Sequence, residues 1–134
     1  MQDTLLLGGA MPHAQHTVLV VDDHLSVRND LRALLEAEGY AVETAENGRA
    51  ALSLLYAGAF PCVIVLDMMM PVMGGLEFRQ EQLNHPRFAD IPVIVLSATQ
   101  ESTISADLLR VDAYLPKPVD VAQLKALVQR YCPQ

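Results

Sequence analysis

The sequence has 134 residues, which fits one domain, and its 51% hydrophobic and 19% charged residues are typical of a globular protein. A formal net charge of −7 argues against nonspecific nucleic-acid binding, which needs a basic surface. No apolar stretch approaches the roughly 20 residues of a membrane-spanning helix, so we expect neither direct nucleic-acid contact nor membrane insertion. Residues 1–16 contain no Lys or Arg and therefore lack the basic flank of a secretory signal. We interpret them as a flexible tail before one domain over 17–132.

The first half of the domain alternates strand and helix. An unbroken apolar run at 18–21 predicts a strand buried on both faces, the habit of parallel sheets covered by helices. A helix capped by Ser26 and closed by Gly39 follows. A short strand at 40–44 and a second helix, between Asn47 and Gly58, complete this half.

The second half repeats the alternation. A strand at 62–66 leads to a helix at about 75–84, and a strand at 93–96 leads to a weaker helix at roughly 100–109. A last strand at about 112–115 precedes a helix at 121–131, which Asp120 and Gln123 begin as a capping box. The predicted fold class is α/β: a doubly wound, five-stranded parallel sheet of the flavodoxin-like (βα)5 type, with strand order 2-1-3-4-5.

Three of the apolar runs end in side chains that carry oxygen. Asp22 and Asp23 follow the first run, Asp67 the second and Ser97 the third. Because parallel strands end at the same edge of a sheet, we expect these groups to converge in one cleft. Carboxylates so close repel one another and favour a bound cation, and oxygen ligands of this kind suit Mg²⁺ (or Mn²⁺). An aspartate beside such an ion can attack a phosphoryl group, and Asp67 is the natural nucleophile.

Lys117 lies between two prolines at the end of the fifth predicted strand, where its positive charge suits a phosphate. Taken singly, an Asp after a strand is usually a turn or cap residue, and a Lys-Pro pair is usually surface loop. Five such groups at the same end of four strands favour a functional site.

These residues resemble the receiver domain of two-component response regulators. The resemblance spans about 17–131 and rests on 20–23 (VVDD), 65–75 (VLDMMMPVMGG), 95–98 (VLSA) and 114–118 (YLPKP), with 44 positions from Asp23 to Asp67 and 30 from Asp67 to Ser97. It implies that Asp67 accepts a phosphoryl group from a histidine kinase or histidine phosphotransfer protein. It also implies that Asp22, Asp23, Asp67 and the backbone carbonyl of Met69 hold the metal, while Ser97 and Lys117 grip the phosphate.

The resemblance assigns further roles around the site. Tyr114 is expected to turn inward as Ser97 moves toward the phosphate, although a half-buried sheet residue is the plainer interpretation. Met69 and Thr99 flank the path of the hydrolytic water and offer no group to orient it, which predicts slow dephosphorylation. His24 follows the acidic pair and could tune the site, but an exposed loop residue is the simpler expectation.

Two features depart from the family pattern. The 20 positions from Ser97 to Lys117 are fewer than usual, and Arg110 begins a tetrapeptide that stands where a Gly-Ala pair is common. The segment that should carry the signal outward is therefore shortened, which leaves the identity of the downstream partner open.

The expected function is that of a cytoplasmic single-domain response regulator, which catalyses only its own phosphorylation and slow dephosphorylation and is not a metabolic enzyme. It either relays the phosphoryl group or binds a downstream protein target. A phosphatase of the haloacid dehalogenase type would need a second acid where Met69 stands, and a flavodoxin-like cofactor binder would need a phosphate loop in place of 22–25 (DDHL). Cys62 and Cys132 lack metal or disulfide-scaffold spacing and are expected to be reduced thiols.

Overall fold

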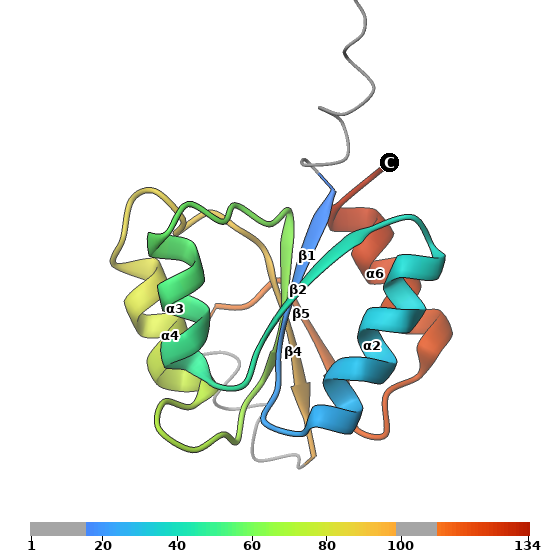
Figure 1. The fold of residues 1–134 in the computed structure, drawn as a ribbon, viewed down its shortest axis with the longest axis horizontal. Coiled ribbons are helices and arrows are strands. Elements are labelled where there is room, and N and C mark those ends of the chain that lie inside the picture. Colours follow the sequence, from blue (N-terminus) through green and yellow to red (C-terminus); the bar gives the residue numbers. More distant parts are fainter. Residues whose placement is uncertain (1–15, 99–109) are drawn as a thin grey trace, which may run out of the picture.

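One parallel β-sheet with helices on both faces organises the chain (Figure 1). The structure is a computed structural model that describes residues 16–98 and 110–134. Its elements are β1 (Thr17–Val21), α2 (Leu25–Ala37), β2 (Ala41–Ala45), α3 (Gly48–Tyr56), β3 (Val63–Asp67), α4 (Gly75–Leu83), β4 (Val93–Ser97), β5 (Ala113–Pro116) and α6 (Val121–Tyr131). The five strands lie in the order β2-β1-β3-β4-β5, which confirms the predicted topology.

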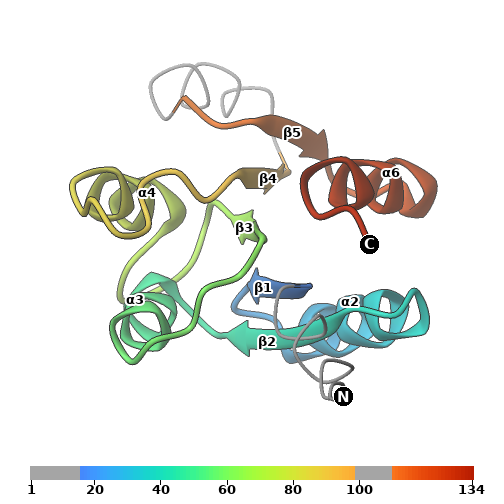
Figure 2. The same ribbon diagram turned by 90° about the horizontal axis from the view of Figure 1, so that it is seen from above.

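The helices form two layers around the sheet. Figure 2 shows α2 and α6 on one face and α3 and α4 on the other. Alternate residues of β3 enter different cores: Ile64 and Leu66 pack in the cluster that contains Phe78 of α4, while Val63 and Val65 pack in the cluster that contains Leu124 of α6. Every position of β3 and β4 is buried, so these strands need apolar residues on both faces. None of the helices in the described part of the chain is long and apolar enough to cross a bilayer.

Some helices and strands begin or end one or a few residues from their predicted bounds, and the predicted cap of the first helix was wrong. Helix α2 begins at Leu25 without a side-chain cap, so Ser26 lies inside the helix. A carboxylate oxygen of Asp22 accepts the backbone N–H of His24 at 2.9 Å, and the turn starts there. The cap of α6 is confirmed, because the Asp120 side chain accepts the backbone N–H of Gln123 at 3.1 Å. The helix expected at 100–109 lies outside the described residues, as does nearly all of the expected tail over 1–16.

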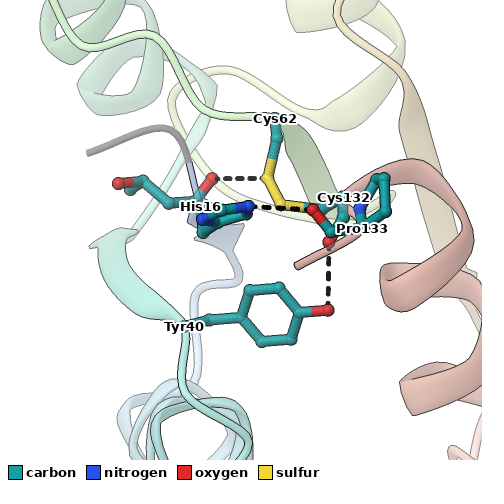
Figure 3. Close-up of a disulfide and its surroundings, with 6 residues drawn as sticks. His16, Tyr40, Cys62, Cys132 and Pro133 are labelled. Carbon is teal, nitrogen blue, oxygen red and sulfur yellow. Dashed lines mark hydrogen bonds between the residues drawn. A yellow bond between two sulfur atoms is a disulfide. The ribbon is translucent and has the colours of Figure 1, made fainter. Parts of the chain in front are cut away.

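The two cysteines form a disulfide, so the expectation of reduced thiols was wrong (Figure 3). Cys62 directly precedes β3 and Cys132 directly follows α6, and both positions lie at the amino-terminal edge of the sheet. Their Cα atoms are 5.3 Å apart, within the range that a disulfide spans. A sequence separation of 70 gave no sign of this proximity, which depends on where α6 ends.

A buried polar network ties α4 to the connections that follow it. Arg79 is 4% exposed and donates to the Gln82 side chain at 2.8 Å and to the Arg110 carbonyl at 2.9 Å. The amide of Gln82 donates in turn to the carbonyls of Phe88 and Ile91, at 2.9 and 3.0 Å. The network therefore holds both the connection that leads into β4 and the backbone at Arg110, shortly before β5.

The backbone of Arg110 predicts a stabilising substitution. Arg110 has φ +52°, a left-handed conformation that costs about 1–2 kcal/mol for a residue with a Cβ but that glycine adopts freely. Arg110→Gly keeps the carbonyl that accepts from Arg79 and should raise the free energy of unfolding by up to about 1 kcal/mol, once the greater chain entropy of glycine is subtracted. Urea titration measures the change. Glu36→Gly, an exposed site within α2, should instead destabilise by about 1 kcal/mol; a loss of stability at both sites would contradict the interpretation.

Candidate functional site

The candidate site lies at the carboxyl-terminal edge of the sheet. Asp67 and Ser97 are the last residues of β3 and β4, Asp22 directly follows β1, and Lys117 directly follows β5. The parallel register sets Asp67 opposite Leu96 and Ser97 opposite Pro116, which brings these strand ends level. The structure thus brings together groups that are as many as 95 positions apart in the sequence.

Lys117 is the centre of the site. Its ammonium Nζ lies 3.1 Å from Oδ1 of Asp67 and 3.3 Å from Oδ2 of Asp22. The carboxylate side chains are only 6% and 1% exposed, whereas the lysine side chain is 25% exposed. Buried carboxylates need a counter-charge or a hydrogen-bond donor, and one ammonium supplies both to this pair.

The backbone holds Lys117 and Asp22 in place. The Lys117 N–H donates to the Ser97 carbonyl at 2.8 Å, so Lys117 is fixed to the end of β4. The Asp22 N–H donates to the Ala45 carbonyl at 3.1 Å, and the guanidinium of Arg28 donates to the Asp22 carbonyl at 2.8 Å. Each side chain therefore projects from a backbone that neighbouring strands or helices hold.

Asp23 and His24 form the more exposed part of the site. Nδ1 of His24 lies 3.3 Å from a carboxylate oxygen of Asp22 and 3.2 Å from Oδ1 of Asp23. Asp22, Asp23 and His24 each offer one ligand atom, and these atoms lie within 4.8 Å of one another. The expectation that His24 is exposed is confirmed by a side-chain exposure of 66%, yet its ring contacts the acidic pair, which sequence reasoning did not resolve.

One atom of this cluster indicates that a cation fits. Oδ1 of Asp23 is buried and accepts no hydrogen bond from the described residues, and its neighbour Nδ1 of His24 lies 3.2 Å away. A buried carboxylate oxygen without a donor is costly unless a cation satisfies it. Oxygen ligands from Asp22, Asp23 and Asp67 are the hard donors that Mg²⁺ prefers.

The surroundings shift the titration of the two central groups. Burial raises the pKa of Asp67 above its ordinary value of 3.8, and the nearby charge of Asp22 adds to this, whereas the hydrogen bond from Lys117 offsets part of the rise. Burial opposes the charge on Lys117, but the hydrogen bond and charge of Asp67 and the charge of Asp22 outweigh it and raise the pKa of the ammonium. Lys117 therefore stays charged, and Asp67 is the group whose ionisation costs free energy.

Two glycines let α4 begin directly behind Asp67. The Gly75 N–H donates to the Met68 carbonyl at 3.0 Å. A Cβ at Gly75 would lie 2.7 Å from the Asp67 carbonyl oxygen and 3.0 Å from the Met68 Cα, closer than such atoms approach. At Gly74 a Cβ would lie 3.2 Å from the Met68 carbonyl oxygen. The glycine pair is thus a site of close backbone contact.

The other predicted site residues differ in how deeply they are buried. Ser97 is 3% exposed, at the end of β4 beside Asp67's strand. Tyr114 of β5 is half-buried and packs against the core cluster that contains Phe78, as its plainer interpretation expected. The side chain of Met69 reaches solvent and is 80% exposed, whereas Met73 is buried in that same core cluster. Thr99 lies outside the described residues.

Comparison with known proteins gives a consistent result. Residues 18–129 match the family model described as the response regulator receiver domain. Response regulator MprA of Mycolicibacterium vanbaalenii is 40% identical over 124 residues, 87% of this chain and 52% of its own length, so the chain spans about half of that relative. An uncharacterised 14.6 kDa protein of Leptolyngbya boryana is 40% identical over 121 residues, 89% of this chain and 92% of its own length.

Solved structures of response regulators are also similar to this chain. The response regulator protein TrrA of Thermotoga maritima, solved in complex with Mg²⁺ and BeF, superposes with a TM-score of 0.77 at 32% identity, covering 86% of this chain and 97% of that one.

The raised pKa of Asp67 predicts how an isosteric change alters stability. In metal-free buffer at neutral pH, Asp67→Asn should raise the melting temperature, because the amide removes a buried charge that costs free energy. The cost is fully present above the folded-state pKa and disappears below the ordinary value of 3.8, so the two proteins should converge as the pH falls toward that value. Circular dichroism melts across this range measure the difference. Asp90→Asn, at an exposed site before β4, is the control. A variant less stable than wild type at neutral pH would contradict the prediction.

Proposed function

The chain belongs to the response regulator receiver domains, and we propose that it accepts a phosphoryl group from a phosphohistidine onto Asp67. The observation that carries the proposal is the placement of Lys117, whose ammonium lies 3.1 Å from Oδ1 of Asp67. A cation beside the nucleophile offsets the charge that three phosphoryl oxygens bring to the carboxylate. In the transfer, an Asp67 oxygen forms a bond to phosphorus, the bond from phosphorus to the donor's imidazole nitrogen breaks, and the nitrogen keeps the electron pair.

A divalent cation completes the proposed site. Asp22, Asp23, Asp67 and the backbone carbonyl of Met69 would hold Mg²⁺ or Mn²⁺, and the buried Oδ1 of Asp23, which accepts no hydrogen bond from the described residues, supports this assignment. The ion, when bound, neutralises charge shared between the carboxylates and the phosphoryl oxygens. The similar Thermotoga maritima structure contains Mg²⁺ with BeF.

Ser97 and Tyr114 are the proposed switch. Ser97 ends the strand next to that of Asp67, where its hydroxyl can donate to a phosphoryl oxygen. Tyr114 pairs in register with Val95, two residues before Ser97. A phosphoryl group of roughly −2 charge would draw Ser97 and Lys117 toward itself and let Tyr114 turn inward. The downstream response is then either binding of a protein target or relay of the phosphoryl group to another histidine.

A groove beside the site offers a docking surface for the phosphohistidine donor. It has a volume of about 320 Å³ and is lined mostly by apolar residues of α2 and of the chain from the end of β5 to the start of α6: Val27, Asp30, Leu31, Lys117, Pro118, Val119 and Val121. Val121 in this lining is 48% exposed, and Leu25, which begins α2, is 61% exposed. We assign this surface to a histidine kinase or histidine phosphotransfer protein, whose histidine must approach Asp67 from the carboxyl edge.

The wider role follows from the same assignment. We propose that this receiver acts in the cytoplasm. It would catalyse only its own phosphorylation and slow dephosphorylation. The net charge of −7 argues that it does not contact nucleic acid directly.

Phosphorylation from a small donor tests the proposal. Incubation with acetyl phosphate and Mg²⁺ should add one phosphoryl group to the wild type, measured by intact mass, and none to Asp67→Asn, which lacks the nucleophilic carboxylate. Chelation of the metal should abolish the gain, and Mn²⁺ should restore it. Asp90→Asn is the matched control and should be phosphorylated like wild type. No gain in the wild type, or an equal gain in Asp67→Asn, would overturn the assignment.

Met69 predicts a long-lived phosphoryl group. Its thioether cannot orient a water for attack on the aspartyl phosphate, so intrinsic dephosphorylation should be slow, and Met69→Asn, which supplies a carboxamide, should shorten the half-life several-fold. Val72→Asn is the matched control, because Val72 is 76% exposed in the same loop, and it should leave the half-life unchanged. The decay is followed by intact mass after the donor is removed. A half-life of seconds that Met69→Asn fails to shorten would contradict the prediction.

A further inference from the structure

The disulfide between Cys62 and Cys132 lies at the edge of the sheet opposite the acidic site. Cys62 precedes β3, whose other end carries Asp67, and Cys132 follows α6, whose first turn begins shortly after Lys117. The bond therefore joins the far end of β3, which supplies Asp67, to the far end of α6, the helix that follows Lys117. Neither the family assignment nor the proposed phosphorylation uses it.

Noncovalent contacts hold Cys132 beside Cys62 independently of the sulfur–sulfur bond (Figure 3). The buried Tyr40 hydroxyl donates to the Cys132 carbonyl at 3.1 Å, and a ring nitrogen of His16 lies 2.8 Å from the Pro133 carbonyl oxygen. Leu124 and Val128 of α6 are fully buried against the sheet. These contacts hold the end of α6 against the sheet, so the two sulfur atoms remain within reach of each other when the bond is open, although the last turn is then less restrained.

The site also accommodates the reduced state. Sγ of Cys62 lies 3.2 Å from the Thr17 carbonyl oxygen, which can accept a hydrogen bond from a Cys62 thiol. Cys62 is partly exposed, whereas Cys132 is 1% exposed. A reagent therefore reaches the pair through Cys62, and Cys132 acts as the protected partner.

We propose that Cys62 and Cys132 form a reversible dithiol–disulfide site that a small-molecule disulfide such as glutathione disulfide oxidises. The Cys62 thiolate attacks the reagent's sulfur and releases one thiolate. The Cys132 thiolate then attacks Sγ of Cys62 and releases the second. Two protein thiols and one small disulfide become one protein disulfide and two small thiols, and the two protons pass to the released thiolates. An excess of the small thiol reverses the sequence.

Oxidation should tighten the end of α6. The bond closes a loop between cysteines 70 positions apart, which restricts the unfolded chain far more than a short loop would. It also prevents the last turn of α6 from fraying away from β3. The redox state thus controls the mobility of α6 by a route that does not require phosphorylation of Asp67.

Titration of the full chain in glutathione redox buffers tests the proposal. After equilibration at a series of ratios of reduced to oxidised glutathione, acid quenching and alkylation, intact mass should show two populations, with both thiols alkylated or neither. The oxidised protein should melt roughly 10 °C higher than the reduced protein, given the length of the loop. Hydrogen exchange of the last turn of α6 should slow on oxidation.

Cys62→Ser is the matched control, because a serine hydroxyl can donate to the same Thr17 carbonyl oxygen. Its melting temperature and its exchange in α6 should not depend on the glutathione ratio. Several results would overturn the proposal: two alkylated thiols at every ratio, a stable singly glutathionylated species, disulfide-linked dimers in place of the internal bond, or a bond that excess glutathione fails to open in the folded protein.

Discussion

The contact of one ammonium with two buried carboxylates is the interaction on which the carboxyl edge of this molecule depends. Asp22 and Asp67 are almost completely buried, and without Lys117 their carboxylates would lack this counter-charge. The three groups come from the ends of three different strands, so their charge balance holds only when β1, β3 and β5 end level with one another. The hydrogen bond from the Lys117 N–H to the Ser97 carbonyl enforces this across β4.

That charge balance also suggests how phosphorylation of Asp67 would change the structure beyond the site. Lys117 is shared, so a phosphoryl group on Asp67, as proposed, would attract it, weaken its contact with Asp22 and pull on the backbone that joins β5 to α6. Ser97 would be affected as well, because its carbonyl accepts the hydrogen bond from the Lys117 N–H. The site is therefore connected to the sheet by the same bonds that assemble it.

Sequence reasoning predicted the features that strand patterning and parallel topology control, and it missed those that depend on particular tertiary contacts. The meeting of Asp67 with Lys117 was predictable, because buried β-branched runs imply parallel strands that share an edge. The start of α2 was not, because a carboxylate of the preceding loop, and not Ser26, begins the turn. Arg79 and Gln82 belong to polar residue types that are mostly exposed, yet backbone carbonyl groups after α4 and before β5 hold them in the interior. The pairing of Cys62 with Cys132 depends on the exact end of α6, which periodicity does not define.

The hydrogen bonds around the amino end of β5 bear on how such chains diversify. Arg110 is held through its carbonyl by Arg79, and Asp112 exchanges two hydrogen bonds with the backbone of Val93, one from its own N–H and one through its side chain. At the other end of the link, Ser97 is fixed in β4. The residues on either side of the connection between β4 and β5 are thus held by their own contacts. Residues can therefore be lost or gained in that connection without moving Lys117. A change in the length of that connection would therefore leave Lys117 beside Asp67.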